Sequence, residues 1–327
     1  MAYDVFNGDA DGICALHMLR LATPAQSTLV TGVKRDIALL RRVPAAPDLD
    51  VLVLDISPDA NADELQRLLN GGARLTWFDH HAAECAEAQR HPRLTLHCDT
   101  SPDVCTSILV DRHLGGRYRH WAVTAAFGDN LKQPAQELAR SLGLGEADTA
   151  ALRQLGQTLN YNAYGECETD LHIAPAALYR AVSAHQTPAG FLATALYRDL
   201  LDGYRSDCAR LHGLQPHWQR DGNAVYVLPP APWACRVNGV LANRLAAHQD
   251  GAAFAVVLER SDGNYLVSVR SGQPGARSAC VLCSEFPTGG GRKAAAGINH
   301  LPADQLSRFI DRFSAYFAPN APHGHGA

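Results

Sequence analysis

Three short apolar runs in the N-terminal part of the chain are each followed directly by acidic or histidine side chains. Tyr3 to Phe6 precedes Asn7-Gly8-Asp9-Ala10-Asp11-Gly12, Val51 to Leu54 precedes Asp55, and Leu75 to Phe78 precedes Asp79-His80-His81. Apolar runs of this length between helical patterns are typical of parallel strands buried on both faces. Because open α/β folds place their ligands at the carboxyl ends of such strands, we expect these side chains to converge.

The rest of the N-terminal pattern predicts a doubly wound α/β domain with a parallel sheet. Two further strands are expected at Ser27 to Thr31 and Leu94 to His97. The helical spacing of apolar residues predicts helices at Ile13 to Leu21, Asp63 to Leu69, Val104 to Leu114 and Trp121 to Phe127. A helical pattern from Pro134 to about Tyr204 is expected to complete this domain.

The length of 327 residues exceeds what one hydrophobic core usually supports and predicts two domains. We expect a first domain at 1–205, a polar linker at 206–222, a second domain at 223–318 and a disordered tail at 319–327. The second domain is expected to be a smaller α/β domain with strands at Ala224 to Leu228, Ala253 to Glu259 and Tyr265 to Val269 and a closing helix at Arg308 to Phe317.

Composition argues against a membrane protein, an exported protein and a protein that binds long nucleic acid. No apolar stretch reaches the ~20 residues of a membrane helix, and Met1 to Phe6 lacks the features of a signal peptide. Nine scattered cysteines favour reduced thiols in a cytoplasmic location. The net charge of -4 excludes a uniformly basic surface, so we do not expect long duplex nucleic acid as a partner. The sequence is compatible with a homodimer and does not determine it.

The acidic residues at the strand ends are best explained together. Any one of them alone would more often be a helix N-cap or a turn former. Carboxylates gathered without compensation would repel one another and weaken folding, and a divalent metal removes that conflict. We therefore predict a metal site, because several possible ligands occur together on successive strand ends. They are Asp9, Asp11, Asp55, Asp79, His80 and His81, with Asp129 in Ala125-Ala126-Phe127-Gly128-Asp129-Asn130 as a later candidate.

The triplet Asp79-His80-His81, together with the earlier aspartates, resembles the motifs of the DHH phosphoesterases. The resemblance implies two divalent ions, manganese being the family's usual metal and magnesium the alternative that oxygen ligands also suit. It also implies that Asp55 bridges the ions, with Asp9 on one ion and Asp11, His80 and Asp129 on the other. Asn7 stands where the family often has histidine and offers only a carbonyl oxygen, so a weaker first metal, ligation through water or a preference for magnesium is expected.

Family resemblance also implies the roles of the remaining triplet residues. His81 would contact the scissile phosphate and assist the leaving oxygen, and Asp79 would orient His80 or His81. The implied chemistry is hydrolysis by a water molecule that the metals activate.

A glycine run near the C-terminus is the second strong signal. Gly289, Gly290 and Gly291 let backbone N–H groups approach an anion, a following helix start would add its positive end, and Arg292 and Lys293 add charge. A lone glycine run is more often a flexible loop. This run, however, resembles the DHH-associated domain of nanoRNases, RecJ-like exonucleases and cyclic-dinucleotide phosphodiesterases, which usually have histidine in the position of Arg292.

Arg270 lies in Val267-Ser268-Val269-Arg270-Ser271, which resembles the strand of that domain whose arginine contacts a substrate phosphate. The alternative for Arg270 is a surface charge on an edge strand. Asn238, Asn243 and Arg244 lie in a segment similar to the family's substrate-facing helix, and a solvated helix face explains them equally well.

These features predict a phosphoesterase that acts on short nucleotides, namely oligoribonucleotides, dinucleotides or 3'-phosphoadenosine 5'-phosphate. Two alternatives stay open. The replacement of two usual histidines by Asn7 and Arg292 is compatible with a weak or inactive member that only binds nucleotide or RNA. A single-strand-specific exonuclease is less favoured, since such an enzyme would have a basic, aromatic-lined channel.

Overall fold

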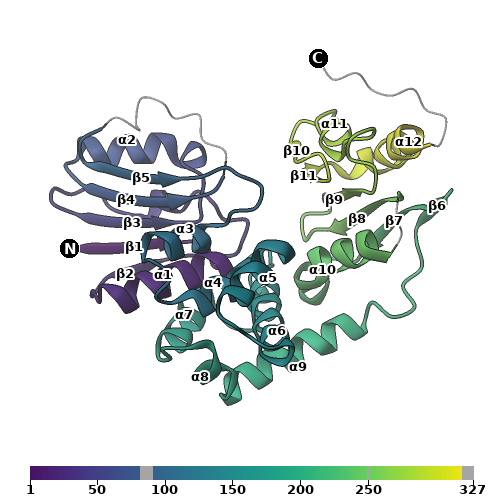
Figure 1. The fold of residues 1–327 in the computed structure, drawn as a ribbon. Coiled ribbons are helices and arrows are strands. Elements are labelled where there is room, and N and C mark those ends of the chain that lie inside the picture. The colour runs from purple at the N-terminus through teal and green to yellow at the C-terminus, as the bar shows by residue number, and fades with distance from the viewer. Residues whose placement is uncertain (82–90, 249–250, 319–327) are drawn as a thin grey trace. The chain divides into compact units, whose positions relative to one another are not determined.

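The computed structural model describes residues 1–81, 91–248 and 251–318 of the chain (Figure 1). The chain divides into two compact units, Met1–Tyr204 and Arg205–Ala327. The tail expected to be disordered, 319–327, lies outside the described residues.

The first unit is built on a five-stranded parallel sheet. Its strands stand in the order β2-β1-β3-β4-β5 and are Ala2–Phe6 (β1), Thr28–Val30 (β2), Asp50–Leu54 (β3), Arg74–Asp79 (β4) and Leu94–Cys98 (β5). Phe6 pairs with Leu54 and Leu54 with Phe78, so the carboxyl ends of β1, β3 and β4 are level. Because β2 and β3 flank β1 on opposite sides, the order of strands reverses there, which is where doubly wound folds form their ligand crevice.

Helices cover both faces of this sheet, which confirms the predicted doubly wound fold. Consecutive strand residues alternate between the faces, as the pleat requires. Phe6, Leu54 and Phe78 pack with α1 (Ala10–Ala22), α4 (Arg119–Gly128) and α6 (Glu146–Asn162). Val5, Val53 and Trp77 pack on the other face with the short helix Leu39–Arg42 (η1) and α2 (Ala62–Asn70). Figure 1 shows α2 and α1 on opposite sides of the strands.

The remaining helices of the first unit are α3 (Thr106–His113), α5 (Lys132–Ser141), α7 (Pro175–Ser183), α8 (Pro188–Leu192) and α9 (Ala195–Ala209). Helix α9 continues through the boundary between the units at Tyr204 and Arg205. The first residues of the expected linker, 206–209, are therefore helical, and Trp218–Arg220 within it forms strand β6.

The second unit has a six-stranded mixed sheet in the order β10-β11-β9-β8-β7-β6. Its predicted strands are found as β7 (Asn223–Leu228), β8 (Ala253–Glu259) and β9 (Tyr265–Ser271), and the closing helix as α12 (Leu306–Phe317). Phe309 and Phe313 of α12 pack on one face, and Leu241 of α10 (Pro232–His248) packs on the other. The elements not predicted are α11 (Ala279–Cys283), β10 (Gly289–Gly291) and β11 (Ala295–Leu301), in addition to β6, while α10 contains the segment that resembles the family's substrate-facing helix.

Across the described ranges, no helix combines the length and the apolar character needed to cross a membrane.

Candidate metal centre

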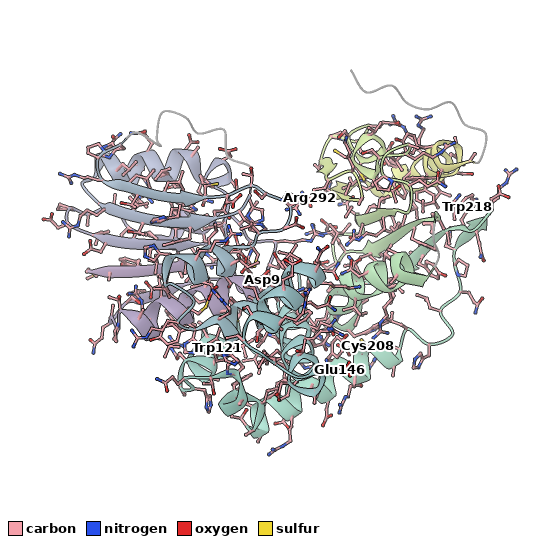
Figure 2. All side chains as sticks on the ribbon, in the orientation of Figure 1. Asp9, Trp121, Glu146, Cys208, Trp218 and Arg292 are labelled. Carbon is pink, nitrogen blue, oxygen red and sulfur yellow. The ribbon has the colours of Figure 1, made fainter. Side chains whose placement is uncertain are left out.

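The predicted acidic residues lie at the carboxyl end of the first unit's sheet. Asp9 (labelled in Figure 2) follows β1 and is the N-cap of α1. Asp55 follows β3 and has a φ of 59°, a left-handed backbone that few residues adopt without a constraint. Asp79 is the last residue of β4. The side chains of Asp9, Asp55 and Asp79 are buried.

Asp9 is fixed by the turn that starts α1. Its Oδ1 accepts hydrogen bonds from the backbone N–H groups of Asp11 (2.9 Å) and Gly12 (3.1 Å), as an N-cap does. A Cβ at residue 12 would lie 2.1 Å from the carbonyl oxygen of Asn7, so only glycine allows a turn this tight. The second oxygen of Asp9, Oδ2, forms an ion pair with the Lys34 ammonium.

Asp11 is held by the N-terminus of α3. Its Oδ2 accepts from the backbone N–H of Thr106 at 2.8 Å and its Oδ1 from that of Ser107 at 2.7 Å. The Thr106 hydroxyl donates to Oδ1 of Asp55 at 3.2 Å. The free N–H groups and positive end of a helix stabilise carboxylates placed in this way. Sequence reasoning missed Thr106 and Ser107, although a Thr-Ser pair near the predicted start of a helix was a usable signal.

Asp129 enters the site from a helix end through a glycine contact. It is the C-cap of α4. A Cβ at residue 128 would meet the Cβ of Ala10 at 2.5 Å and the carbonyl oxygen of Gly156 at 2.9 Å, so Gly128 lets α4 pack closely on both α1 and α6. This close approach brings Asp129 to the aspartates that follow β1 and β3.

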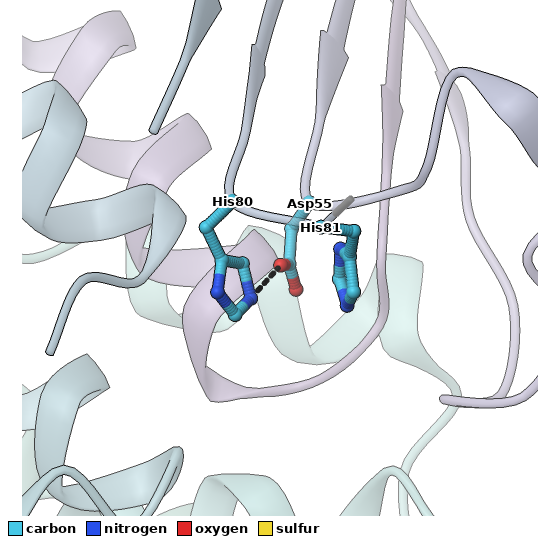
Figure 3. A group of neighbouring side chains, drawn as sticks. All are labelled: Asp55, His80 and His81. Atoms are coloured by element: carbon cyan, nitrogen blue, oxygen red, sulfur yellow. Dashed lines mark ion pairs between the residues drawn. The ribbon is translucent and has the colours of Figure 1, made fainter. Parts of the chain in front are cut away.

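His80 is shared by the two groups of side chains that could hold a metal ion. Two groups have ligand atoms within 4.8 Å of one another, Asp55 with His80 and His81, and Asp11 with His80 and Asp129. His80 Nε2 lies 3.4 Å from Oδ1 of Asp55 (Figure 3) and 3.7 Å from Oδ2 of Asp129. His80 Nδ1 is buried with no hydrogen-bond partner among the described residues. These oxygen and imidazole donors fit a divalent ion such as manganese or magnesium.

The pKa shifts show that the positive charges near Asp55 and Asp11 do not outweigh their burial and the neighbouring carboxylates. Burial, and then the neighbouring charges of Asp11, Asp9 and Asp129, raise the pKa of Asp55 well above its usual value. Burial and the Asp129 charge also raise the pKa of Asp11. A metal ion would favour the ionised form of both groups. Asp9 differs, because the Lys34 ammonium and hydrogen bonds outweigh its burial and lower its pKa.

His81 lies at the edge of this cluster and is oriented by Asp79. Its Nδ1 lies 2.7 Å from Oδ1 of the fully buried Asp79, while 45% of the His81 side chain is exposed. Burial lowers the pKa of His81, but the Asp79 carboxylate outweighs it, and the net shift is upward. The geometry thus has an imidazole held by a buried carboxylate and open to solvent on its other side.

Asn7, a predicted ligand, has both ends of its amide engaged. Its Oδ1 accepts from the backbone N–H of Asp9 at 3.3 Å, and its Nδ2 donates to the carbonyl of Lys34 at 3.2 Å. Sequence reasoning missed Lys34, whose ammonium lies within the acidic cluster. Its signal was its place three residues after the expected strand Ser27 to Thr31, at the same edge of the sheet as the aspartates.

The glycine run of the second unit forms a hairpin. Gly289–Gly291 is strand β10 and pairs in antiparallel fashion with Ala296, Gly297 and Ile298 of β11. Arg292 and Ala295 exchange backbone hydrogen bonds of 2.9 and 3.2 Å across a tight turn. The expectation that a helix start follows the glycines is therefore wrong, because the chain reverses direction there and pairs with itself instead of winding into a helix.

The glycines of this hairpin have different surroundings. A Cβ at residue 289 would lie 1.7 Å from the Cys283 carbonyl oxygen, whereas a Cβ at residue 290 would meet nothing within 4 Å. Gly291 has a φ of 136°, which strains any other residue. Arg292, labelled in Figure 2, and Lys293 are both exposed at the turn. The first glycine is thus required by packing, and the second is not.

Arg270 lies beside this hairpin on β9. It pairs in register with Ala295, the first residue of β11, and it is half-buried. Its Nε donates to Oδ1 of Asn243 on α10 at 3.2 Å. Arg270 and the turn cations Arg292 and Lys293 therefore belong to one part of the second unit. Of the weaker candidates in α10, Asn238 is buried and Arg244 is exposed.

Comparison with known proteins identifies the fold. No protein-family model matches the chain, and no curated protein matches its sequence. Among solved structures, the chain is similar to a manganese-bound exonuclease RecJ, with 18% identity over 98% of this chain and 91% of that chain and a TM-score of 0.59. A Thermus thermophilus RecJ in complex with Mn2+ matches with 18% identity over 97% of this chain and 52% of that one, with a TM-score of 0.57.

A third similar structure is the pGpG-specific phosphodiesterase PggH from Vibrio cholerae. It has 13% identity and a TM-score of 0.56, over 97% of this chain and 99% of that chain. RecJ and PggH are both DHH superfamily proteins, so the fold expected from the sequence resemblance is confirmed.

Proposed function

We propose that this chain is a metal-dependent phosphoesterase of the DHH superfamily that hydrolyses short nucleotides. The observation that carries the proposal is the convergence of Asp11, Asp55 and Asp129 on His80 at the carboxyl end of the sheet. They come from four different segments of the chain. Assembling buried carboxylates in this way costs folding stability unless a cation joins them.

The protein's own residues would position the ion and the substrate around it. Asp11, Asp55, His80 and Asp129 would hold a divalent ion, which, when bound, would supply positive charge to a phosphoryl group and make water more acidic. The backbone N–H groups of Thr106 and Ser107 keep the Asp11 carboxylate aimed at the site. Such support by groups behind the ligands fixes geometry and improves metal affinity.

His81 is the residue best placed to move a proton. Asp79 holds Nδ1, which leaves Nε2 on the more exposed side of the ring. A protonated His81 would donate a hydrogen bond from Nε2 to a phosphate oxygen and then a proton to the leaving oxygen. Asp79 supports this role by stabilising the imidazolium and by fixing which nitrogen carries the hydrogen.

Short substrates are favoured by charge and by the likeness to PggH. The net charge of -4 gives no general attraction for a long polyanion, whose binding depends mainly on phosphate contacts by lysine and arginine. PggH, which like one RecJ structure matches over nearly all of both chains, is described as pGpG-specific. We therefore propose linear dinucleotides as the first substrates to test, with Arg270, Arg292 and Lys293 binding the phosphate that is not cleaved.

Hydrolysis of a defined panel tests the proposal. Metal-depleted protein is supplied with Mn2+ and incubated with a 5'-phosphorylated diribonucleotide, a cyclic dinucleotide, 3'-phosphoadenosine 5'-phosphate and a long single-stranded DNA. We expect the linear dinucleotide to be hydrolysed fastest, and we expect Asp79→Ala to lose about 100-fold or more of that rate because His81 loses its orienting partner.

Asp50→Asn is a matched control, because Asp50 begins strand β3 at the end away from the site and pairs with the exposed Arg74. Its rate should equal that of the unchanged protein. Binding of the dinucleotide without hydrolysis under any metal would contradict the proposal and support a nucleotide-binding protein. Preferred hydrolysis of the long DNA would instead identify an exonuclease.

A further inference from the structure

A lysine ammonium lies inside the acidic cluster of the first unit. Lys34 Nζ forms an ion pair with Oδ2 of Asp9 and lies 3.3 Å from Oδ1 of Asp129 and 3.2 Å from Oδ1 of Asn160. An ammonium has three N–H donors, and these three oxygens account for all of them. The side chain is 25% exposed, so most of it is enclosed by the site. Lys34 is therefore a built component of the cluster.

The backbone around Lys34 is fixed on two sides. Its N–H donates to the carbonyl of Ala163 at 2.8 Å, and its own carbonyl accepts from Nδ2 of Asn7 at 3.2 Å. A Cβ at residue 8 would lie 2.1 Å from the carbonyl oxygen of Gly32, so Gly8 allows the two segments to approach. The turn that carries Asp9 and the segment that carries Lys34 are thus packed directly against each other.

The oxygens of Asn7 and Asp9 already have partners, so these two residues are not counted as metal ligands. Oδ1 of Asn7 is engaged by the backbone N–H of Asp9. Oδ1 of Asp9 accepts two backbone N–H groups, and its Oδ2 is occupied by the ammonium. Among the described residues, neither group of side chains able to hold a metal includes Asp9, and both groups include His80. The two groups differ except for His80, and a neutral imidazole has one free nitrogen lone pair, so they are alternative ligand sets for one ion at a time.

We propose that this site takes one divalent ion, held by Asp11, Asp55, His80 and Asp129, and that the Lys34 ammonium takes the place of a second ion beside Asp9. The inference rests on the proposed function, because it specifies how many ions that hydrolase uses. A second ion at Asp9 would have to displace a salt-bridged ammonium or lie against it, and like charges at such a distance repel strongly in a buried site. When a substrate phosphate binds, the positive charge beside Asp9 would be that of Lys34 and not that of a second ion.

Metal stoichiometry tests the proposal independently of activity. Metal-depleted full-length protein is equilibrated with Mn2+, the ions per chain are counted by elemental analysis, and the bound Mn2+ is examined by electron paramagnetic resonance. We expect about one ion per chain and the spectrum of an isolated Mn2+. About two ions per chain with an exchange-coupled spectrum would overturn the inference and leave the hydrolase proposal intact. No bound ion would overturn both.

Lys34→Met provides the second measurement, with Lys132→Met as its matched control. Methionine keeps the unbranched, apolar stem and removes the charge, and Lys132 is an exposed lysine at the start of α5 in the same unit. We expect Lys34→Met to bind about two ions, because the Asp9 carboxylate becomes available, and Lys132→Met to bind about one. An unchanged count in folded Lys34→Met, with folding checked by circular dichroism, would contradict the proposal. If Lys34→Met does not fold, the count for the unchanged protein decides.

Discussion

The candidate metal centre of the first unit and the glycine hairpin of the second both carry charged side chains with proposed roles, but these side chains have different surroundings. At the metal centre the carboxylates of Asp9, Asp11 and Asp55 are buried, and each accepts hydrogen bonds from the groups around it. On the hairpin, Arg292 and Lys293 are exposed at a turn. Buried charges interact strongly and are costly when unpaired, whereas water and salt screen exposed ones. Changes at the metal centre should therefore have much larger effects than changes at the hairpin.

Asp55→Asn should have the largest effect. We expect the hydrolysis rate to fall about a thousandfold, since the amide removes a charge at the point where the ligands meet. The metal-free variant should be more stable than the unchanged protein, because the burial of a charge and the carboxylate repulsion, which together raise the Asp55 pKa, are gone. Thermal unfolding with and without Mn2+ measures both changes. A variant that is less stable without metal would contradict the claim that Asp55 is uncompensated.

His17, buried in the core of the first unit, should make stability sensitive to acid. Its Nε2 lies 2.8 Å from the carbonyl oxygen of His185, its ring meets Trp121 edge-on (labelled in Figure 2), and burial lowers its pKa to about 4 from 6.5. The folded pKa lies below the unfolded one, so this contribution is present above pH 6.5 and is lost as pH falls towards 4. The loss amounts to about 3 kcal/mol.

Urea unfolding at several pH values measures this loss, with His17→Gln as the comparison, because glutamine can donate to the same carbonyl and does not titrate. The variant should show a smaller fall in unfolding free energy between pH 6.5 and 4. Equal slopes would mean that His17 is not the titrating group.

Two neighbouring glycines of the hairpin should differ in their effect on folding. Gly289→Ala places a Cβ 1.7 Å from a backbone oxygen and should destabilise the protein by about 2 kcal/mol. Gly290→Ala meets open space and should change stability by less than about 0.5 kcal/mol. Denaturant unfolding measures both values. Equal losses would mean that backbone freedom along the run, and not packing at Gly289, determines its stability.

Arg292→Ala should have the smallest effect. An exposed arginine that binds a phosphate contributes about 1 kcal/mol, so KM for a dinucleotide should rise about fivefold while kcat stays unchanged. Arg220→Ala is the matched control, since Arg220 is an exposed arginine on β6, at the opposite edge of the same sheet. A fall in kcat of Arg292→Ala would show that Arg292 acts on the reacting phosphate, and equal KM changes in both variants would remove its proposed role.

Much of the fold, and the strand ends that carry the site residues, could be predicted because both depend on local sequence patterns. The apolar runs ending at Phe6, Leu54 and Phe78 identified three adjacent strands, and their parallel pairing brings the following residues to one edge. The strands β10 and β11 were not predicted, because glycine and alanine carry little pattern of their own and these strands exist through pairing with β9.

The sequence alone predicted two α/β domains and placed Asp9, Asp55 and Asp79 at the ends of strands. It also carried the resemblance to DHH phosphoesterases. Only the tertiary structure decided which partners those residues have. It placed the N-terminus of α3 behind Asp11, brought Asp129 in through the contact at Gly128 and inserted Lys34 beside Asp9. The physical reason is distance along the chain. Strand ends follow from neighbouring residues, whereas compensation of a buried charge depends on residues that meet only when the helices pack.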